Sequence, residues 1–270
     1  MTLIHQITSM EKRLKDHLVL LYHLMAESNL IDYAKYELVD KVVRCTSGIP
    51  KSFLNALIGI PDTDWDQSIA RQKAHFNRVK IPFVWYVDDK DIQFQQSLIN
   101  HGFSDEGLFR GVVGKIDQSR LHIEPLEGFS IERVQDEKTM DDFSVLVAEN
   151  FAQDEKTRCM YKQFLWQMTD SANHHFVHWI AKKQGKVLSV LTTFIENELV
   201  SFWNGATDMV YRRMGLSTML RKMALQDALL QGCKMGCSYL MAEAMALGIC
   251  NKLGFETQWR FKAYVGPSSC

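Results

Sequence analysis

The stretch VYRRMGLSTML, residues 210–220, places two arginines and one glycine directly before an apolar repeat. Because the apolar residues recur at i, i+3, i+4 and i+7, the repeat predicts a helix that begins with GLST. Backbone N–H groups of a first helical turn carry partial positive charge, and the arginines add to it. The stretch therefore predicts an anion site at a helix start; an ordinary strand-to-helix turn with surface arginines is the other interpretation. The repeat consists of Leu216, Met219, Leu220 and Met223.

Composition and motifs narrow the class of protein further. The chain has 270 residues, 46% hydrophobic and 23% charged, as expected for a globular protein of one or two domains. Neither a GxxxxGK[ST] nor a GxGxxG motif occurs, which argues against a P-loop and a dinucleotide fold. The net charge is −1, and residues 1–122 carry 15 basic and 15 acidic residues, so we expect no nucleic-acid partner.

The N-terminal region predicts neither a membrane span nor a secretory signal. Its most apolar run, HLVLLYHLMA at residues 17–26, is short and interrupted by histidine, and the charged EKRLKDH overlaps its start. We therefore expect a cytoplasmic protein without a membrane partner. In such a protein the six cysteines are expected to be reduced thiols.

The second half of the chain alternates helix and strand patterns, which predicts a mixed α/β domain. Residues 175–210 are rich in β-branched and aromatic residues, with turn signals at KQGK and ENE, and predict a three-stranded antiparallel meander. Gly232 is expected to end the helix that begins at GLST. We further expect strands at 129–134, 237–244 and 257–265, and helices at 136–151, 154–170 and 245–253.

An internal repeat indicates two related domains. GFSDEGLFRGVVG begins at Gly102, and GFETQWRFKAYVG begins 152 residues later at Gly254. Each copy is predicted to end a helix at Gly-Phe and then enter a strand; chance similarity of two such units is the alternative. A Pro and a Gly interrupt the periodicity near residue 122, so we expect domains at 1–122 and 123–270.

The run GATDMVYRRMGLSTML, followed by YLMAEAMALGICNKLGFE, resembles the GNAT superfamily of N-acetyltransferases. The family signature is Q/R-x-x-G-x-G/A, and Arg212, Gly215 and Ser217 occupy its three defined positions. The likeness covers about residues 128–266. It implies two GNAT-like domains, each a mixed and mostly antiparallel sheet flanked by helices. The first half resembles a degenerate copy without a recognisable cofactor loop.

The resemblance implies acetyl-CoA as co-substrate and assigns residues to it. The pyrophosphate would lie on the backbone amides of the loop, and the pantetheine arm would pair with main chain as an added strand. Gly205, beside Asn204, is a place where a bulge would open the sheet. The implied cofactor residues are Gly205, Ala206, Thr207, Arg212, Arg213, Met214, Gly215, Leu216, Ser217 and Thr218.

Amine attack on a thioester requires a proton acceptor, oxyanion stabilisation and protonation of the leaving thiolate. The resemblance implies a tyrosine acid at the position of Cys250 and, in some members, a base carboxylate at the position of Ser201. The Cys250 thiol could act as the acid, although a cysteine side chain is shorter than that of tyrosine. The alternative interpretation is that Cys250 is a small buried side chain. Glu198 and Glu243 are the substitute bases, with solvated surface charges as the alternative for each.

No metal site is predicted. On a strand, His174 and His178 would share one face and His175 would point away, and no third ligand is spaced to join the first two. Cys233 and Cys237 lack a partner pair. The sequence therefore predicts an N-acetyltransferase acting on a primary amine of a small molecule or peptide, and it does not specify the oligomeric state. A non-catalytic acyl-CoA-binding sensor or interaction module is the alternative function, and a scaffold without ligand is the third.

Overall fold

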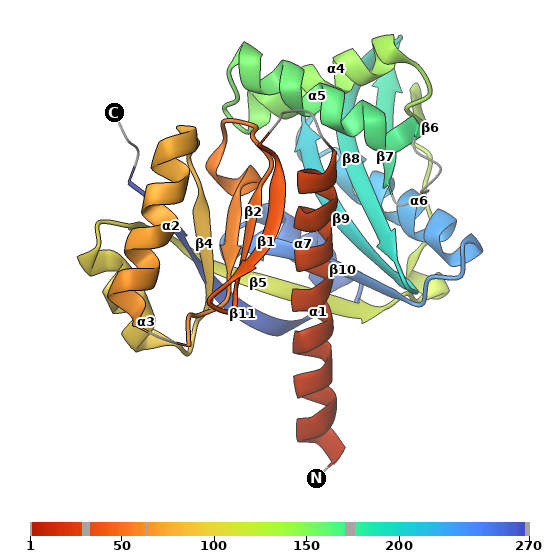
Figure 1. Ribbon diagram of the computed structural model, residues 1–270. Helices are drawn as coiled ribbons and strands as arrows, with labels where there is room; N and C mark the ends of the chain where they lie inside the picture. Colours follow the sequence, from red (N-terminus) through yellow and green to blue (C-terminus); the bar gives the residue numbers. More distant parts are fainter. Residues whose placement is uncertain (1, 29–32, 63, 171–175, 268–270) are drawn as a thin grey trace. The chain divides into compact units, whose positions relative to one another are not determined.

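The structure is a computed structural model that describes residues 2–28, 33–62, 64–170 and 176–267 (Figure 1). Its helices and mixed β-strands confirm the predicted α/β class. The chain divides into two compact units, neither of which is one continuous segment. Unit 1 consists of residues 1–111, 240–243 and 257–270, and unit 2 consists of residues 112–239 and 244–256.

The described residues of unit 1 form a mixed sheet and three α-helices, of which α2 and α3 pack side by side (Figure 1). Its elements are α1 (Thr2–Glu27), β1 (Lys35–Val39), β2 (Val42–Thr46), β3 (Ala56–Ile58), α2 (Trp65–Val79), β4 (Val84–Asp88), α3 (Ile92–Asn100), the first part of β5 (Ser104–Lys115) and nearly all of β11 (Glu256–Val265). The strand order is β1-β2-β3-β4-β11-β5. β3 and β4 are parallel, whereas β4 and β11 are antiparallel.

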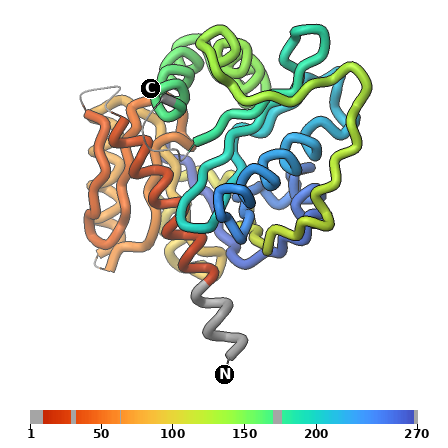
Figure 2. The backbone as a smooth tube through the Cα atoms, turned by 90° about the vertical axis from the view of Figure 1, so that its right-hand side faces the viewer, coloured from red at the N-terminus to blue at the C-terminus, as the bar shows by residue number. Residues whose placement is uncertain are grey.

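Unit 2 contains the predicted meander and the helix that begins with GLST. Its elements are β6 (Phe129–Arg133), α4 (Glu137–Asn150), α5 (Glu155–Asp170), β7 (Phe176–Lys183), β8 (Lys186–Glu196), β9 (Leu199–Thr207), α6 (Leu216–Leu230), most of β10 (Met235–Met241) and α7 (Met245–Lys252). The order is β5-β10-β9-β8-β7-β6, with β9 and β10 parallel. In Figure 2, α4 and α5 lie on one side of the β7–β9 strands and α6 lies on the other.

The meander and the helix stop are confirmed. β7, β8 and β9 pair antiparallel in succession. The turn between β8 and β9 has positive φ at both Asn197 and Glu198, the conformation of a two-residue hairpin loop. Gly232 has φ +86° directly after the last turn of α6, and the Cys233 N–H donates to the carbonyl of Ala228 at 2.9 Å.

The sequence repeat corresponds to one repeated structural motif. Gly102 and Gly254 have φ values of +84° and +86°, and each follows a short helix. The N–H of Phe103 donates to Leu98, and that of Phe255 donates to Cys250, across the same six-residue turn. Both helices thus end in a Schellman motif and lead into the strands β5 and β11.

The final strand of each sequence copy contributes to the unit built mainly from the other copy. β11 pairs with β4 over five residue pairs, and its Tyr264 lies in the core of unit 1 with Trp85. The second part of β5 lies beside β10 in unit 2. The compact units therefore differ from the division expected after residue 122, because that division kept each copy's last strand with its own copy.

Unit 1 has the same strand-helix-strand order at β3, α2 and β4 that unit 2 has at β9, α6 and β10. The loop before α2 is acidic, however, with Asp62 and Asp64 in it and Asp66 in the first helical turn. The Asp64 carboxylate accepts a hydrogen bond from the Gln67 N–H at 3.2 Å and caps the helix. A carboxylate thus lies at this helix start, where the corresponding loop of unit 2 carries arginines.

Candidate active site

The loop between β9 and α6 leaves the start of α6 uncapped. Gly215 is the N-cap residue with φ +91°, and no side chain caps the helix. The first hydrogen bond of α6 runs from the Met219 N–H to the Gly215 carbonyl, at 2.9 Å. The N–H groups of residues 216–218 come before it and therefore have no acceptor within the helix. These amides and the helix dipole favour an anion at this point.

Gly215 is required here by backbone conformation. Its φ lies in the left-handed region that favours glycine, and a Cβ built on it would meet no atom within 4 Å. The space in front of the helix start is therefore open. A β-branched residue would both strain the backbone and project into that space.

The two loop arginines differ in their environments. The Arg212 side chain is exposed, and its Nε donates to the Thr207 carbonyl at 3.2 Å while its second terminal nitrogen donates to Asn150 Oδ1 at 2.8 Å. Arg212 thus fastens the loop to the end of β9 and to α4. Arg213 is exposed and has φ +66°. Both contribute positive charge beside the uncapped amides.

β9 separates from β10 before it reaches this loop. The parallel ladder pairs Leu199 with Met235 and ends where Phe202 pairs with Ser238. The remaining residues of β9, 203–207, lie beyond that ladder, although Ala206 and Thr207 still pair with β8 on the other side. Residues 203–207 therefore have one edge toward β8, and their opposite edge makes no ladder pairs with β10.

The expected bulge lies in this segment. The register between β8 and β9 shifts so that Val190 pairs with Ala206 whereas Thr192 pairs with Trp203. Asn204 and Gly205 therefore face a single residue of β8, which is the arrangement of a β-bulge. Asn204 has φ +54°, a conformation that asparagine adopts more readily than most residues.

The Asn204 side chain holds the bulge through a partly buried hydrogen-bond network. Its Oδ1 accepts from the Tyr161 hydroxyl at 2.8 Å, and its Nδ2 donates to Thr192 Oγ1 at 3.0 Å. Thr192 Oγ1 lies 2.8 Å from Nδ1 of His178, and Nε2 of His178 lies 3.2 Å from the Leu165 carbonyl. Since a carbonyl only accepts, Nε2 carries the proton, and the neutral imidazole satisfies every bond in this chain.

A pocket of about 580 Å³ adjoins the helix start within unit 2. It combines cationic side chains with apolar ones, and Lys222 donates to the His122 carbonyl at 2.7 Å across it. That mixture suits a ligand with phosphate groups and an aromatic base. The lining residues are Ser119, Arg120, His122, Ile123, Glu124, Leu126, Met214, Gly215, Thr218, Met219 and Lys222.

The structure places the three candidate catalytic residues in different surroundings. Cys250 is fully buried in α7 of unit 2; burial raises the pKa of its thiol, and Arg221 opposes that rise. Glu198 precedes β9 and pairs with Lys234, whereas the loop follows the other end of this nine-residue strand, roughly 30 Å away. Glu243 is exposed and belongs to unit 1. The geometry thus separates Glu198 from the helix start.

Ser201, at the position where some family members carry a carboxylate, is fully buried. It accepts a hydrogen bond of 2.7 Å from the Trp203 indole and donates to the Phe194 carbonyl at 3.3 Å. His178 is the described member of the histidine cluster; His174 and His175 lie outside the described residues. Within the described part of the chain, His, Cys, Asp and Glu form no group of three suited to a metal ion.

Sequence reasoning missed Arg221. It occupies an interior position of α6 among apolar residues, and its side chain is only 3% exposed. Its terminal nitrogen donates to the Ser217 carbonyl at 3.2 Å and also to the Ser217 hydroxyl. The sequence did contain one signal for it: Arg221 is a cation among apolar helix residues, and it follows Ser217 by four positions, the spacing of neighbours on one helix face.

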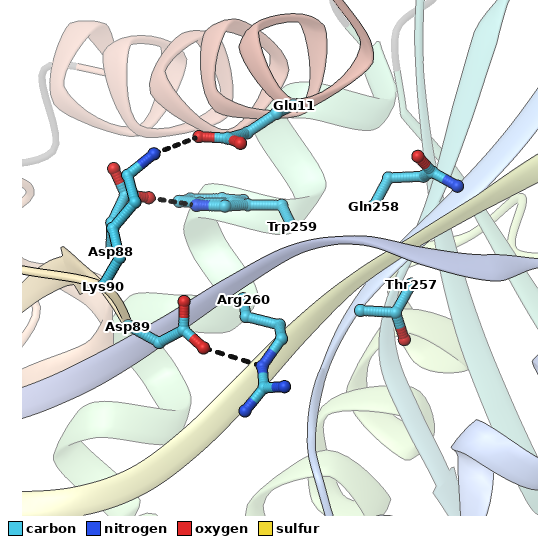
Figure 3. A pocket seen from close by; sticks show the side chains of 8 residues that line it. All are labelled: Glu11, Asp88, Asp89, Lys90, Thr257, Gln258, Trp259 and Arg260. Atoms are coloured by element: carbon cyan, nitrogen blue, oxygen red, sulfur yellow. Dashed lines mark hydrogen bonds and ion pairs between the residues drawn. The ribbon is translucent and has the colours of Figure 1, made fainter. Parts of the chain in front are cut away.

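A second cavity, of about 220 Å³, lies in unit 1 and is lined by eight residues (Figure 3). Its charged groups pair with one another: Arg260 with Asp89 at 2.7 Å and Lys90 with Glu11 at 3.5 Å. The Trp259 indole donates to Asp88. Because these charges are satisfied locally, we assign no ligand to this cavity.

The sequence matches no protein-family model and no curated protein. Solved structures do resemble it. A GCN5-related N-acetyltransferase from Kribbella flavida superposes with a TM-score of 0.64 at 12% identity, over 90% of this chain and 94% of that one. A protein of unknown function from Staphylococcus epidermidis gives 0.68 at 11% identity, over 90% and 99%.

A tandem GNAT protein from the clavulanic acid biosynthesis pathway gives a TM-score of 0.55 at 13% identity, over 84% of this chain and 79% of that one. At such identities the likeness establishes the fold. The chain therefore has the GNAT fold of N-acetyltransferases, and its similarity extends to the tandem arrangement. None of the helices in the described residues is long and apolar enough to cross a membrane.

Proposed function

We propose that unit 2 is an acetyl-CoA-dependent N-acetyltransferase that acts on a primary amine of a small molecule or peptide. One observation carries the proposal: a strand that leaves the β10 ladder after Phe202 is followed, after one short loop, by an uncapped helix start with positive-φ Gly215. An anion site and a free strand edge are thus adjacent in the chain. Coenzyme A has a pyrophosphate and an amide-containing arm that match these two features.

The residues present fit this co-substrate. Acetyl-CoA, when bound, supplies an acetyl group activated as a thioester. The amides of Leu216, Ser217 and Thr218, assisted by Arg212 and Arg213, would hold the pyrophosphate. Main-chain groups of Gly205, Ala206 and Thr207 would pair with the pantetheine arm as an added strand, while Met214 and the cationic pocket beside α6 would hold the adenosine end.

Two features of the catalytic residues favour the alternative of a non-catalytic acyl-CoA-binding module. Cys250 stands at the position that the resemblance assigns to a tyrosine acid, and its thiol is fully buried. Ser201 stands where some members have a carboxylate, and its hydroxyl is engaged with Trp203 and Phe194. Both observations concern the protonation steps and leave the binding features unaffected.

Calorimetry with acetyl-CoA and an amine-panel assay with thiol detection test the proposal together. Binding with release of free thiol in the presence of one amine class supports the transferase. Binding without turnover for small amines, polyamines and peptide N-termini supports the binding module. Absence of binding at millimolar acetyl-CoA contradicts both.

A further inference from the structure

Arg221 is a buried cation whose charge has no carboxylate partner among the ion pairs of the described residues. Its Nε is buried and makes no hydrogen bond, and one terminal nitrogen donates to the carbonyl and hydroxyl of Ser217. A buried guanidinium without a counter-ion is unfavourable, because desolvation is not offset by an opposite charge. Such a group is an expected binding site for negative charge that arrives with a ligand or develops in a reaction.

The guanidinium lies beside the segment of β9 that has left the β10 ladder. One terminal nitrogen is 3.0 Å from the position that a Cβ on Gly205 would take, and Cζ is 5.6 Å from the centre of the Phe202 ring. Arg221 therefore lies beside β9 between Gly205, in the part that is not paired with β10, and Phe202, the last residue paired with β10. A Cβ at position 205 would require this nitrogen to move by a few tenths of an ångström.

This position corresponds to the sulfur end of the arm in the proposed complex. The anion site follows Thr207, at the open end of the segment, so an arm running from it along β9 reaches Phe202 last. This inference rests on the proposed function. We propose that Arg221 supplies the positive charge that stabilises the coenzyme A thiolate as the carbon–sulfur bond breaks.

The reaction balances without further reactants. The amine nitrogen bonds to the acetyl carbon, the carbon–sulfur bond breaks, and the sulfur leaves with the electron pair as a thiolate. The proton lost by the amine nitrogen goes to solvent, and the thiolate takes up a proton there after release. Arg221 contributes an electrostatic role only, since a guanidinium stays protonated throughout the working pH range.

Cys250 does not fill this role. Burial raises the pKa of its thiol, so the neutral thiol predominates near pH 7 and carries no charge to balance Arg221. A structural brace is the competing explanation of Arg221, because it bonds the first turn of α6 through Ser217. The two explanations differ in one measurable quantity, the pKa of the thiol of bound coenzyme A.

Ultraviolet difference titration measures that pKa directly. The absorbance of the complex with coenzyme A, minus that of the complex with desulfo-coenzyme A, isolates the ligand thiolate from protein groups. We expect the thiol pKa to fall by about one unit on binding, which equals a roughly tenfold preference for the thiolate. In Arg221→Met the shift should vanish. Any loss of affinity for desulfo-coenzyme A would report the separate contact of Arg221 with Ser217 in the pyrophosphate loop.

Two further variants make the result decisive. Arg133→Met removes an exposed arginine of the same unit, paired with Asp227, and should keep the full shift. If Arg221→Met does not fold, Arg221→Gln removes the charge with a polar side chain and should also lose the shift. An unshifted thiol in the unmodified protein, or a shift that survives in the folded Arg221 variant, overturns the inference. Failure of both ligands to bind contradicts the proposed function instead.

Discussion

The Tyr161 hydroxyl donates a hydrogen bond of 2.8 Å to Oδ1 of Asn204, the residue at which β9 bulges. Tyr161 comes from α5 and is 5% exposed, so this bond is shielded from water. Burial raises the pKa of the phenol, which therefore stays protonated as a donor. A tyrosine on one helix thus fixes the strand geometry that separates β9 from β10.

Tyr161→Phe should leave Asn204 Oδ1 without its donor in a partly buried site. We expect the free energy of unfolding to fall by about 1–3 kcal/mol and the affinity for coenzyme A to fall with it. Chemical denaturation and calorimetry measure the two effects. Tyr36→Phe, which removes a hydroxyl in unit 1, is the matched control and should leave affinity unchanged; equal losses in both variants would contradict this role.

Gly215→Val should weaken coenzyme A binding far more than Ser217→Ala. The valine strains the backbone at φ +91° and enters the open space before the helix. Ser217 already accepts a bond from Arg221 and retains its hydroxyl proton for a phosphate oxygen, so its loss should cost roughly two- to tenfold in affinity.

Gly232→Val provides the matched control for the glycine, because Gly232 has φ +86° and equally open surroundings at the other end of α6. We expect it to lower the midpoint of thermal unfolding and to leave the dissociation constant unchanged. If Gly215→Val bound coenzyme A like the parent while Ser217→Ala did not, the loop would not be the pyrophosphate site.

The chain should bind one coenzyme A molecule. In unit 1 the loop before α2 carries Asp62 and Asp64, and the Asp64 carboxylate caps the helix that would otherwise receive a phosphate. Repulsion between carboxylates and phosphate opposes binding there. Calorimetry should give a stoichiometry near one, and Gly215→Val should remove that single site; a stoichiometry of two would disprove this prediction.

His178 should make the protein less stable in weak acid. Burial lowers its pKa from an unfolded value of about 6.5 to about 4 in the folded protein. Because the folded pKa is the lower one, protonation favours unfolding: the contribution is complete above about pH 6.5 and is lost as the pH falls toward 4. The total is about 3 kcal/mol.

Denaturation curves between pH 7 and 4 test this dependence. His178→Gln should start from a lower stability at pH 7 and lose less of it on acidification than the parent. The remaining slope would come from other groups, including the half-buried His75, whose pKa burial also lowers to about 4. Parallel stability curves for parent and variant would show that His178 is not responsible.

Local patterns were sufficient to predict the elements of unit 2. The apolar repeat of α6, the turns flanking β8 and the stop at Gly232 depend on neighbouring residues, and the structure has each of them. The bulge at Asn204 and Gly205 could also be predicted from the sequence, because a glycine inside a strand often lies at a β-bulge. These features need no knowledge of distant contacts.

The strand partners and Arg221 could not be predicted in this way. The sequence of β11 specifies a strand, but nothing in it indicates β4 rather than a strand of its own copy as the partner. Arg221 is visible in the sequence only as a cation among apolar helix residues, and its contacts with Gly205 and Phe202 are not. Both depend on tertiary packing, which spacing along the chain does not encode.

The placement of β11 bears on how the protein is made by the ribosome. Unit 1 includes residues 1–111, yet its strand β4 lacks its β11 neighbour until residues 256–265 have been synthesised. A chain stopped after residue 122 would expose the edge of β4 to pairing with other chains. Synthesis of β11, rather than completion of the first half, is therefore the step that covers this edge of β4.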